Sequence, residues 1–139
     1  MSLVAVRSAL QGALDAISPA IATAWENVPF DASTDVAIGS PYQRVNLLLA
    51  RPDDDEISRS NYVERGILQI MLCYPKDAGA EPAAARALLI RQAFYRGRSI
   101  VSGSVTVTIF TTPEIAPALI EGDRYAVPVS VRFTAPINS

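Results

Sequence analysis

The sequence predicts an α+β fold in which a mixed or antiparallel sheet of about four to six strands carries a pair of helices. Three observations predict this fold. Residues 62–74 form a largely apolar run with the alternation of a strand, and residues 3–17 and 80–96 carry apolar side chains at helical spacing. Residues 105–110 and 124–134 alternate between apolar and polar side chains, which is typical of half-buried strands.

Residues 62–74 form the expected central strand. Neighbouring residues of a strand point to opposite faces, so in the second half of this segment one face is fully apolar and the other is apolar except at Gln69. The first half carries Glu64 and Arg65, so the second half is the part expected to be buried. A strand of this kind belongs in the middle of a sheet with other elements packed on each face. The apolar side chains are Leu68, Ile70 and Leu72 on one face and Ile67, Met71 and Cys73 on the other.

The first part of the chain alternates between helix, loop and strand patterns. Apolar residues recur every three or four positions up to Ile17, and Pro19 ends the helix because proline disfavours the helical conformation in the residue before it. The adjacent aspartates Asp53 to Asp55 lack the alternating oxygen ligands and central glycine of a calcium loop, so we interpret them as a solvated turn. The expected elements are a helix at 3–17, a strand at 21–28, a loop at 29–41, a strand at 42–50 and a charged loop at 51–56.

The second helix, at 80–96, is apolar almost all round. Glu81 and Pro82 suit its first turn, and Gly97 suits the left-handed position past its end. A helix packed on one sheet buries a single stripe, so the remaining apolar face is either exposed alanine or a subunit interface. The arginines on this helix or just beyond it either keep the surface soluble or pair with the acidic loop of a neighbouring subunit. They are Arg86, Arg91, Arg96 and Arg98. The candidate interface residues are Arg86, Leu89, Ala93 and Arg96.

The end of the chain reads as strands separated by short connections. Residues 99–101 and 105–110 are extended, residues 113–121 form a connection, and residues 124–134 show the clearest alternation in the chain. Pro128 cannot donate a ladder hydrogen bond, which predicts an edge or a bulge at this position. We expect one domain over residues 1–139, because 139 residues are too few for two domains with separate cores.

The composition argues against most catalysis. The chain has no histidine, which serine and cysteine hydrolases use as a base and many zinc sites use as a ligand. Its formal net charge of −2 provides no basic field for nucleic acid. The single cysteine, Cys73, excludes an internal disulfide, and no secretion signal or membrane-spanning stretch is indicated. We therefore expect no catalytic, cofactor-binding or metal-binding residues, no membrane partner and no specific nucleic acid binding.

Four stretches of the sequence carry a family resemblance. They are Trp25 to Asp31, Pro41 to Leu47, Gly66 to Ile70 and Ala118 to Ala135. Their Trp, Pro, Gly and alternating apolar residues resemble those of the phage tail terminator-like family. These are tail completion proteins of tailed phages and prophages, similar in role to the lambda minor tail protein U. The motifs are structural, so the resemblance transfers no catalytic residue.

The resemblance implies a virion structural protein that is made in the host bacterial cytoplasm and ends up in the virion tail. It implies a homo-oligomer, a hexameric ring that caps the tail tube protein, terminates tail growth and docks to the head-completion or neck protein. Met71, Cys73 and Phe110 would add apolar surface for such a ring. Two alternatives stay open. One is a neck protein that joins head to tail, and the other is a small enzyme or ligand-binding module, which would need a concave pocket with convergent polar groups.

Overall fold

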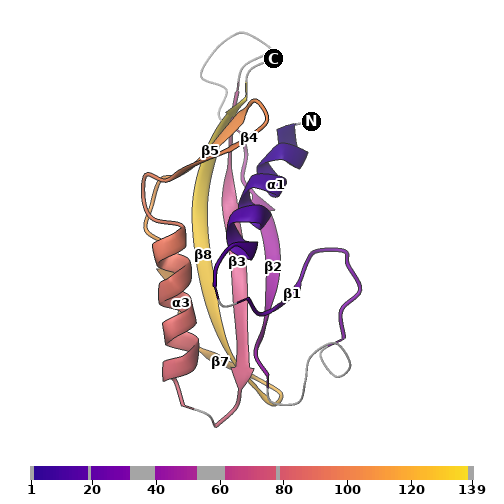
Figure 1. The fold of residues 1–139 in the computed structure, drawn as a ribbon, viewed down its shortest axis with the longest axis vertical. Coiled ribbons are helices and arrows are strands. Elements are labelled where there is room, and N and C mark those ends of the chain that lie inside the picture. The colour runs from indigo at the N-terminus through magenta and orange to yellow at the C-terminus, as the bar shows by residue number, and fades with distance from the viewer. Residues whose placement is uncertain (1, 19, 32–39, 53–61, 78, 138–139) are drawn as a thin grey trace.

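We describe residues 2–18, 20–31, 40–52, 62–77 and 79–137 of the chain from a computed structural model. In this part of the chain two helices lie against an eight-stranded sheet (Figure 1). The helices are α1 (Ser2–Asp15) and α3 (Glu81–Ala93). The strands are β1 (Ala22–Ala24), β2 (Tyr42–Leu49), β3 (Tyr62–Pro75), β4 (Ser99–Ser102), β5 (Val105–Ile109), β6 (Glu114–Ile115), β7 (Leu119–Glu121) and β8 (Arg124–Ile137).

The strand order is β1-β2-β3-β8-β5-β4, and β6 and β7 also pair with β8. Strand β1 runs parallel to β2 and the other pairs are antiparallel, so the sheet is mixed and the α+β class is confirmed. The sheet has more strands than predicted. The additional ones are short, and two or three residues are too few to show a period of two in a sequence.

The long strands β3 and β8 form the centre of the sheet. Each has 14 residues, and they pair from Tyr62 opposite Ile137 to Pro75 opposite Arg124. Directly paired residues share a face, so one apolar face continues from β2 across β3 to β8. Full burial of a large aliphatic side chain stabilises the fold by about 1.5–3 kcal/mol. The buried side chains on this face include Val45, Leu68, Ile70, Leu72, Val127, Val129, Val131 and Phe133.

Both helices cover this same face. Helix α1 contributes Val6, Leu10 and Leu14 to the core, while α3 contributes Ala83, Ala87, Ile90 and Phe94. In Figure 1, α3 lies at the lower left along β8, and α1 crosses in front of the upper half of the sheet. The helices therefore cover one face of residues 62–74, as predicted. On the opposite face of the sheet, called the outer face below, Ile67 and Met71 are only half-buried.

The predicted strand at 21–28 is wrong beyond Ala24. The Val28 N–H donates a hydrogen bond to the Trp25 carbonyl at 3.3 Å, and Asn27 has a φ of 56°, so the chain turns there. The connection at 113–121 contains β6 and β7. Helix α3 ends at Ala93, three residues before the predicted end, and Gly97 takes the expected positive φ, 93°. Residues 32–39 and 53–56, from the two predicted loops, lie outside the described residues.

The sequence predicted an edge or a bulge at Pro128, and the edge is wrong because β8 lies inside the sheet. Pro128 pairs with Met71 in the middle of the sheet, and its carbonyl accepts a hydrogen bond from Ala116 N–H at 2.9 Å. The nitrogen and carbonyl of a strand residue point to the same side, so the missing N–H faces the side of β8 that carries β6 and β7. The ladder is interrupted there between Ile115 and Leu119, and a proline is tolerated for that reason.

Glu26 connects α1 to the free edge of β2 beyond β1. Its carboxylate accepts hydrogen bonds from Arg7 Nη1, at 3.0 Å, and from the Leu47 N–H. Burial opposes ionisation of Glu26, but these hydrogen bonds and the Arg7 charge outweigh it and lower the pKa of the carboxyl below its ordinary value of 4.5.

We expect Glu26→Gln to lower the free energy of unfolding by about 1 kcal/mol at neutral pH, because Gln cannot supply charge-assisted acceptors. The contribution of Glu26 is present above the unfolded-state pKa and is lost as the pH falls through the lower folded-state pKa. Urea unfolding at pH 7 and pH 3 should therefore show a difference between variant and wild type that shrinks at pH 3. The exposed Glu114→Gln is the control, and an equal deficit at both pH values would contradict the assignment.

Replacement of Gly66 and of Gly12 by alanine should have opposite effects on stability. An added Cβ at Gly66 would lie 2.5 Å from the Leu48 carbonyl oxygen and 3.1 Å from the Phe133 ring, whereas one at Gly12 would meet nothing within 4 Å. We expect Gly66→Ala to destabilise by about 1–3 kcal/mol through overpacking. Gly12→Ala should stabilise α1 by about 0.5–1 kcal/mol. Thermal unfolding of the pair checks both, and a neutral Gly66→Ala would contradict the close approach of β2 to β3.

Candidate functional site

Within the described residues, no three Cys, Asp or Glu side chains are grouped as metal ligands would be. The acidic run at 53–56 lies outside the residues described. Neither described helix is long and apolar enough to span a membrane.

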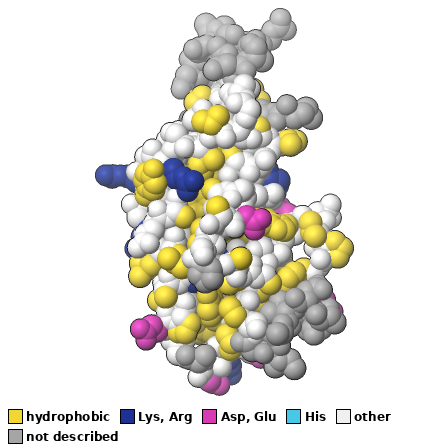
Figure 2. Space-filling view, viewed as in Figure 1, with side chains coloured by type: hydrophobic (Ala, Val, Ile, Leu, Met, Phe, Trp, Pro, Cys, Tyr) yellow, Lys and Arg dark blue, Asp and Glu magenta, His cyan; other side chains and the backbone are white. Residues whose placement is uncertain are grey.

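Exposed apolar side chains are the feature that needs a functional explanation. Figure 2 shows hydrophobic side chains gathered in a band along the helix-bearing face, with charged side chains mainly toward its margins. Large exposed apolar patches on a protein are typical of interaction sites. The large hydrophobic residues with substantial exposure are Leu3, Val4, Val28, Leu48, Leu49, Leu88, Tyr95, Val101, Phe110, Leu119 and Ile120.

Helix α3 presents a different face from the predicted one. Arg86 is only 4% exposed and lies on the sheet-facing side, while Leu89 and Ala93 are half-buried and pack against the core. Arg96 is exposed just beyond the helix, so the structure does not bring the four residues together on one outer surface. The exposed apolar stripe of α3 consists of Ala84, Ala85, Leu88 and Tyr95.

The burial of Arg86 was missed because α3 is apolar on most sides and its sequence does not indicate which stripe meets the sheet. Burial lowers the pKa of Arg86, and the nearby Tyr74 opposes this shift. Burial also raises the pKa of Tyr74. Arg86 thus belongs to the packing between α3 and β3, and its guanidinium is not available on the surface of the protomer.

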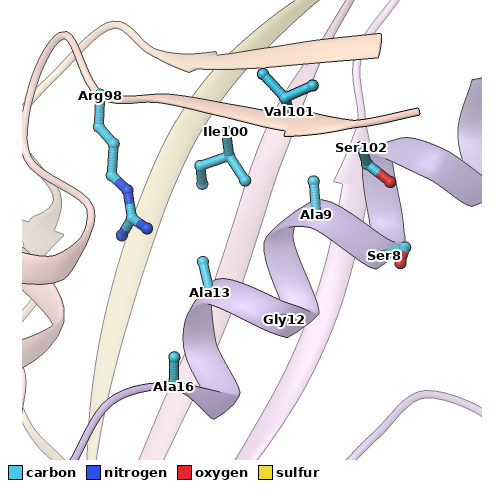
Figure 3. Close-up of a pocket in the computed structure, with 9 residues that line it drawn as sticks. All are labelled: Ser8, Ala9, Gly12, Ala13, Ala16, Arg98, Ile100, Val101 and Ser102. Atoms are coloured by element: carbon cyan, nitrogen blue, oxygen red, sulfur yellow. The ribbon is translucent and has the colours of Figure 1, made fainter. Parts of the chain in front are cut away.

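A groove of about 360 Å³ lies between α1 and β4. Figure 3 shows the small side chains Ala9, Ala13 and Ala16 along α1 facing Ile100 on β4, with Arg98 at one end. The Arg98 guanidinium donates to the Ala93 carbonyl, where it compensates the C-terminal end of α3. The remaining polar side chains that line this groove are Ser8 and Ser102, and the lining includes no base to activate either hydroxyl. The groove is therefore not built as a nucleophilic active site.

The outer face of the sheet, opposite the helices, is closed at one end. The Tyr42 ring packs against Phe30 at 5.4 Å between centroids, and the Arg124 guanidinium lies 4.9 Å from the Tyr42 centroid. Arg44 pairs with Glu121 at 2.9 Å, a contact that joins β2 to β7 across β3 and β8 and so requires a curled sheet. Cys73 is 1% exposed beneath this layer, and burial raises the pKa of its thiol.

The described residues leave the other end of the outer face less covered. A hollow of about 200 Å³ is lined by Ile67 and Phe110 together with Arg65 and Arg132. Leu48 pairs with Ile67 and is 48% exposed, and Phe110 is 44% exposed. Phe110 was predicted from the sequence to be surplus apolar surface, but the two arginines were not predicted to lie there. Odd-numbered residues of β3 and even-numbered residues of β8 point to the outer face, so Arg65 and Arg132 both lie there. The register between the two strands is what brings these two arginines close together.

The comparisons with known proteins come from a family model and a solved structure. A family model described as phage tail terminator protein matches residues 5–133. One similar solved structure is 23% identical, with 97% of this chain and 96% of that chain covered and a TM-score of 0.76. That similarity shows the fold. A comparison with curated proteins gives no match.

Substitutions at adjacent positions of α3 distinguish its buried side from its exposed side. We expect Leu89→Glu to destabilise the protomer by about 2–4 kcal/mol, because it places a charge against the core. Leu88→Glu should change stability by less than about 0.5 kcal/mol, because Leu88 is 49% exposed. Circular dichroism during urea unfolding measures both. Equal effects of the two substitutions would contradict the observed orientation of α3.

Proposed function

This chain belongs to the phage tail terminator family, and we propose that it forms a closed hexameric ring that caps the tail tube, ends tail growth and presents the docking surface for the head. Family membership makes it a structural protein of the virion tail that interacts with other tail or virion proteins. The finer steps of capping and docking are the proposal.

The observation that carries the proposal is the amount of apolar surface that the protomer leaves uncovered. The exposed residues lie on several elements, including α3, the outer face of the sheet and the β7 hairpin. A ring requires one patch that fits a different patch on the next copy, with a rotation that closes. Permanent assemblies commonly bury more than about 2,000 Å² per contact and are relatively apolar. Because the exposed apolar residues lie on different elements of one protomer, each copy has more than one apolar patch with which to contact its two neighbours in a ring.

The proposed action is binding without turnover. The hollows described above are lined by apolar residues, arginines and serines, an environment that can hold a protein side chain but offers no paired acid and base. The tail tube protein and the head-completion protein are the expected partners besides further copies of the chain. Each would use a face of the ring that contacts between copies leave free.

We expect the purified chain to add to the ends of preformed tail tubes and to stop their elongation. Negative-stain electron microscopy with a tagged chain should show label at one end of each tube, and native mass spectrometry should show the six-copy species that the proposed ring requires. A matched tube preparation without the chain should keep elongating. A chain that stays monomeric with tubes present and leaves their length unchanged would overturn the proposal, and label at the portal end of heads instead would favour a neck protein.

A further inference from the structure

We propose that neighbouring copies are joined by the β7 hairpin of one copy, residues 119–123, seated in the outer-face hollow of the next copy. The hollow is the one lined by Ile67, Phe110, Arg65 and Arg132. This contact rests on the proposed function, because it specifies how the ring would be held together. It is a heterologous contact, in which every copy offers both the hairpin and the hollow.

The hairpin has the form of a protruding apolar plug. Leu119 and Ile120 are 52% and 57% exposed, and the turn that follows them places Gly122 at a φ of 58°. Within the described residues β7 pairs with β8 alone. Adjacent residues of a strand point to opposite sides, so one of the two, Ile120, is the side chain assigned to the hollow. Each CH₂ group that it buries there contributes to association.

The hollow has the form of a socket for side chains. Its volume of about 200 Å³ lies below the roughly 300–1,000 Å³ of drug-sized ligand sites. Ile67 and Phe110 supply apolar walls, and Arg65 and Arg132 supply positive charge. An apolar side chain that carries a carboxylate beside it matches this combination.

The charges of the two surfaces are complementary. The hairpin carries Glu121 and Asp123, both exposed, and the hollow carries Arg132. Glu121 already pairs with Arg44 of its own copy, so Asp123 is the carboxylate assigned to the neighbouring hollow. Charge pairs at the rim of an apolar contact set register and partner choice more than affinity.

One copy cannot make this contact with itself. Leu119 pairs with Ala126 near the start of β8, whereas Arg132 in the hollow lies six positions further along the same strand. Six residues of strand span about 20 Å. The two surfaces are therefore held apart by the rigid strand that carries both, and only a second copy can bring them together.

Paired charge reversal tests the contact. We expect Arg132→Glu and Asp123→Arg each to lower the association constant between copies at least tenfold, and the double variant to recover most of the loss. Native mass spectrometry and light scattering measure the assembled fraction, and circular dichroism checks that each variant is folded. Asp15→Arg, a charge reversal at an exposed acid of α1, is the control. Single variants that assemble like the wild type, or a double variant no better than either, would overturn the inference.

Cross-linking locates the contact directly. A mixture of Phe110→Cys and Ile120→Cys chains treated with a short bismaleimide should give covalent dimers, and neither variant alone should do so. Cys73 is 1% exposed and should not react in the folded chain. Val101→Cys, on β4, replaces Phe110→Cys as the control. A ring that forms without this cross-link overturns the inference and leaves the proposed function standing, whereas a chain that is monomeric both alone and with tubes overturns both.

Discussion

The pairing of β3 with β8 over 14 residues is the constraint on which the rest of the structure depends. Each strand is apolar on the face that meets the helices, and a shift of one residue in register would turn these side chains to the opposite face. Gly66 shows how tightly the register is held, because the Phe133 ring and the Leu48 carbonyl occupy the space of its missing side chain. Strand β2 pairs with the free side of β3, and β7, β6 and β5 pair in succession with the free side of β8. The remaining strands β1 and β4 pair with β2 and β5.

The placement of both helices on one face determines where the protein can interact. With α1 and α3 on the same side, the described residues cover the outer face best at the end where Tyr42, Arg124 and the Arg44–Glu121 pair lie over Cys73. At the other end Leu48, Ile67 and Phe110 remain at the surface. A protomer built in this way has a core on one side of its sheet and exposed apolar side chains on the other. Such a surface is suited to contact with other subunits of an assembly.

The long elements could be predicted from sequence and the short ones could not. Alternation over many residues identified β3 and β8, and helical spacing with Glu81, Pro82 and Gly97 identified α3. Strands of two or three residues leave no such pattern. The orientation of α3 was also hidden, because a helix that is apolar all round gives no sign that Arg86 will be buried and Leu88 exposed. The hollow depends on the register between β3 and β8 and on the position of Phe110 after β5, which no local pattern contains.

The edges of the sheet explain why assembly would use side chains rather than added strands. An open edge is a template for pairing with another chain, and proteins limit it with short strands and charged groups. Here β1 has three residues, and just beyond it the Glu26 carboxylate accepts the Leu47 N–H that a further strand would use. At the opposite edge β4 has four residues and ends at the tight turn of Gly103. Both described edges therefore present few backbone groups with which another strand could pair. A contact between copies through the side chains of the hairpin and the hollow is more specific, because its apolar fit and its charges select one partner in one register.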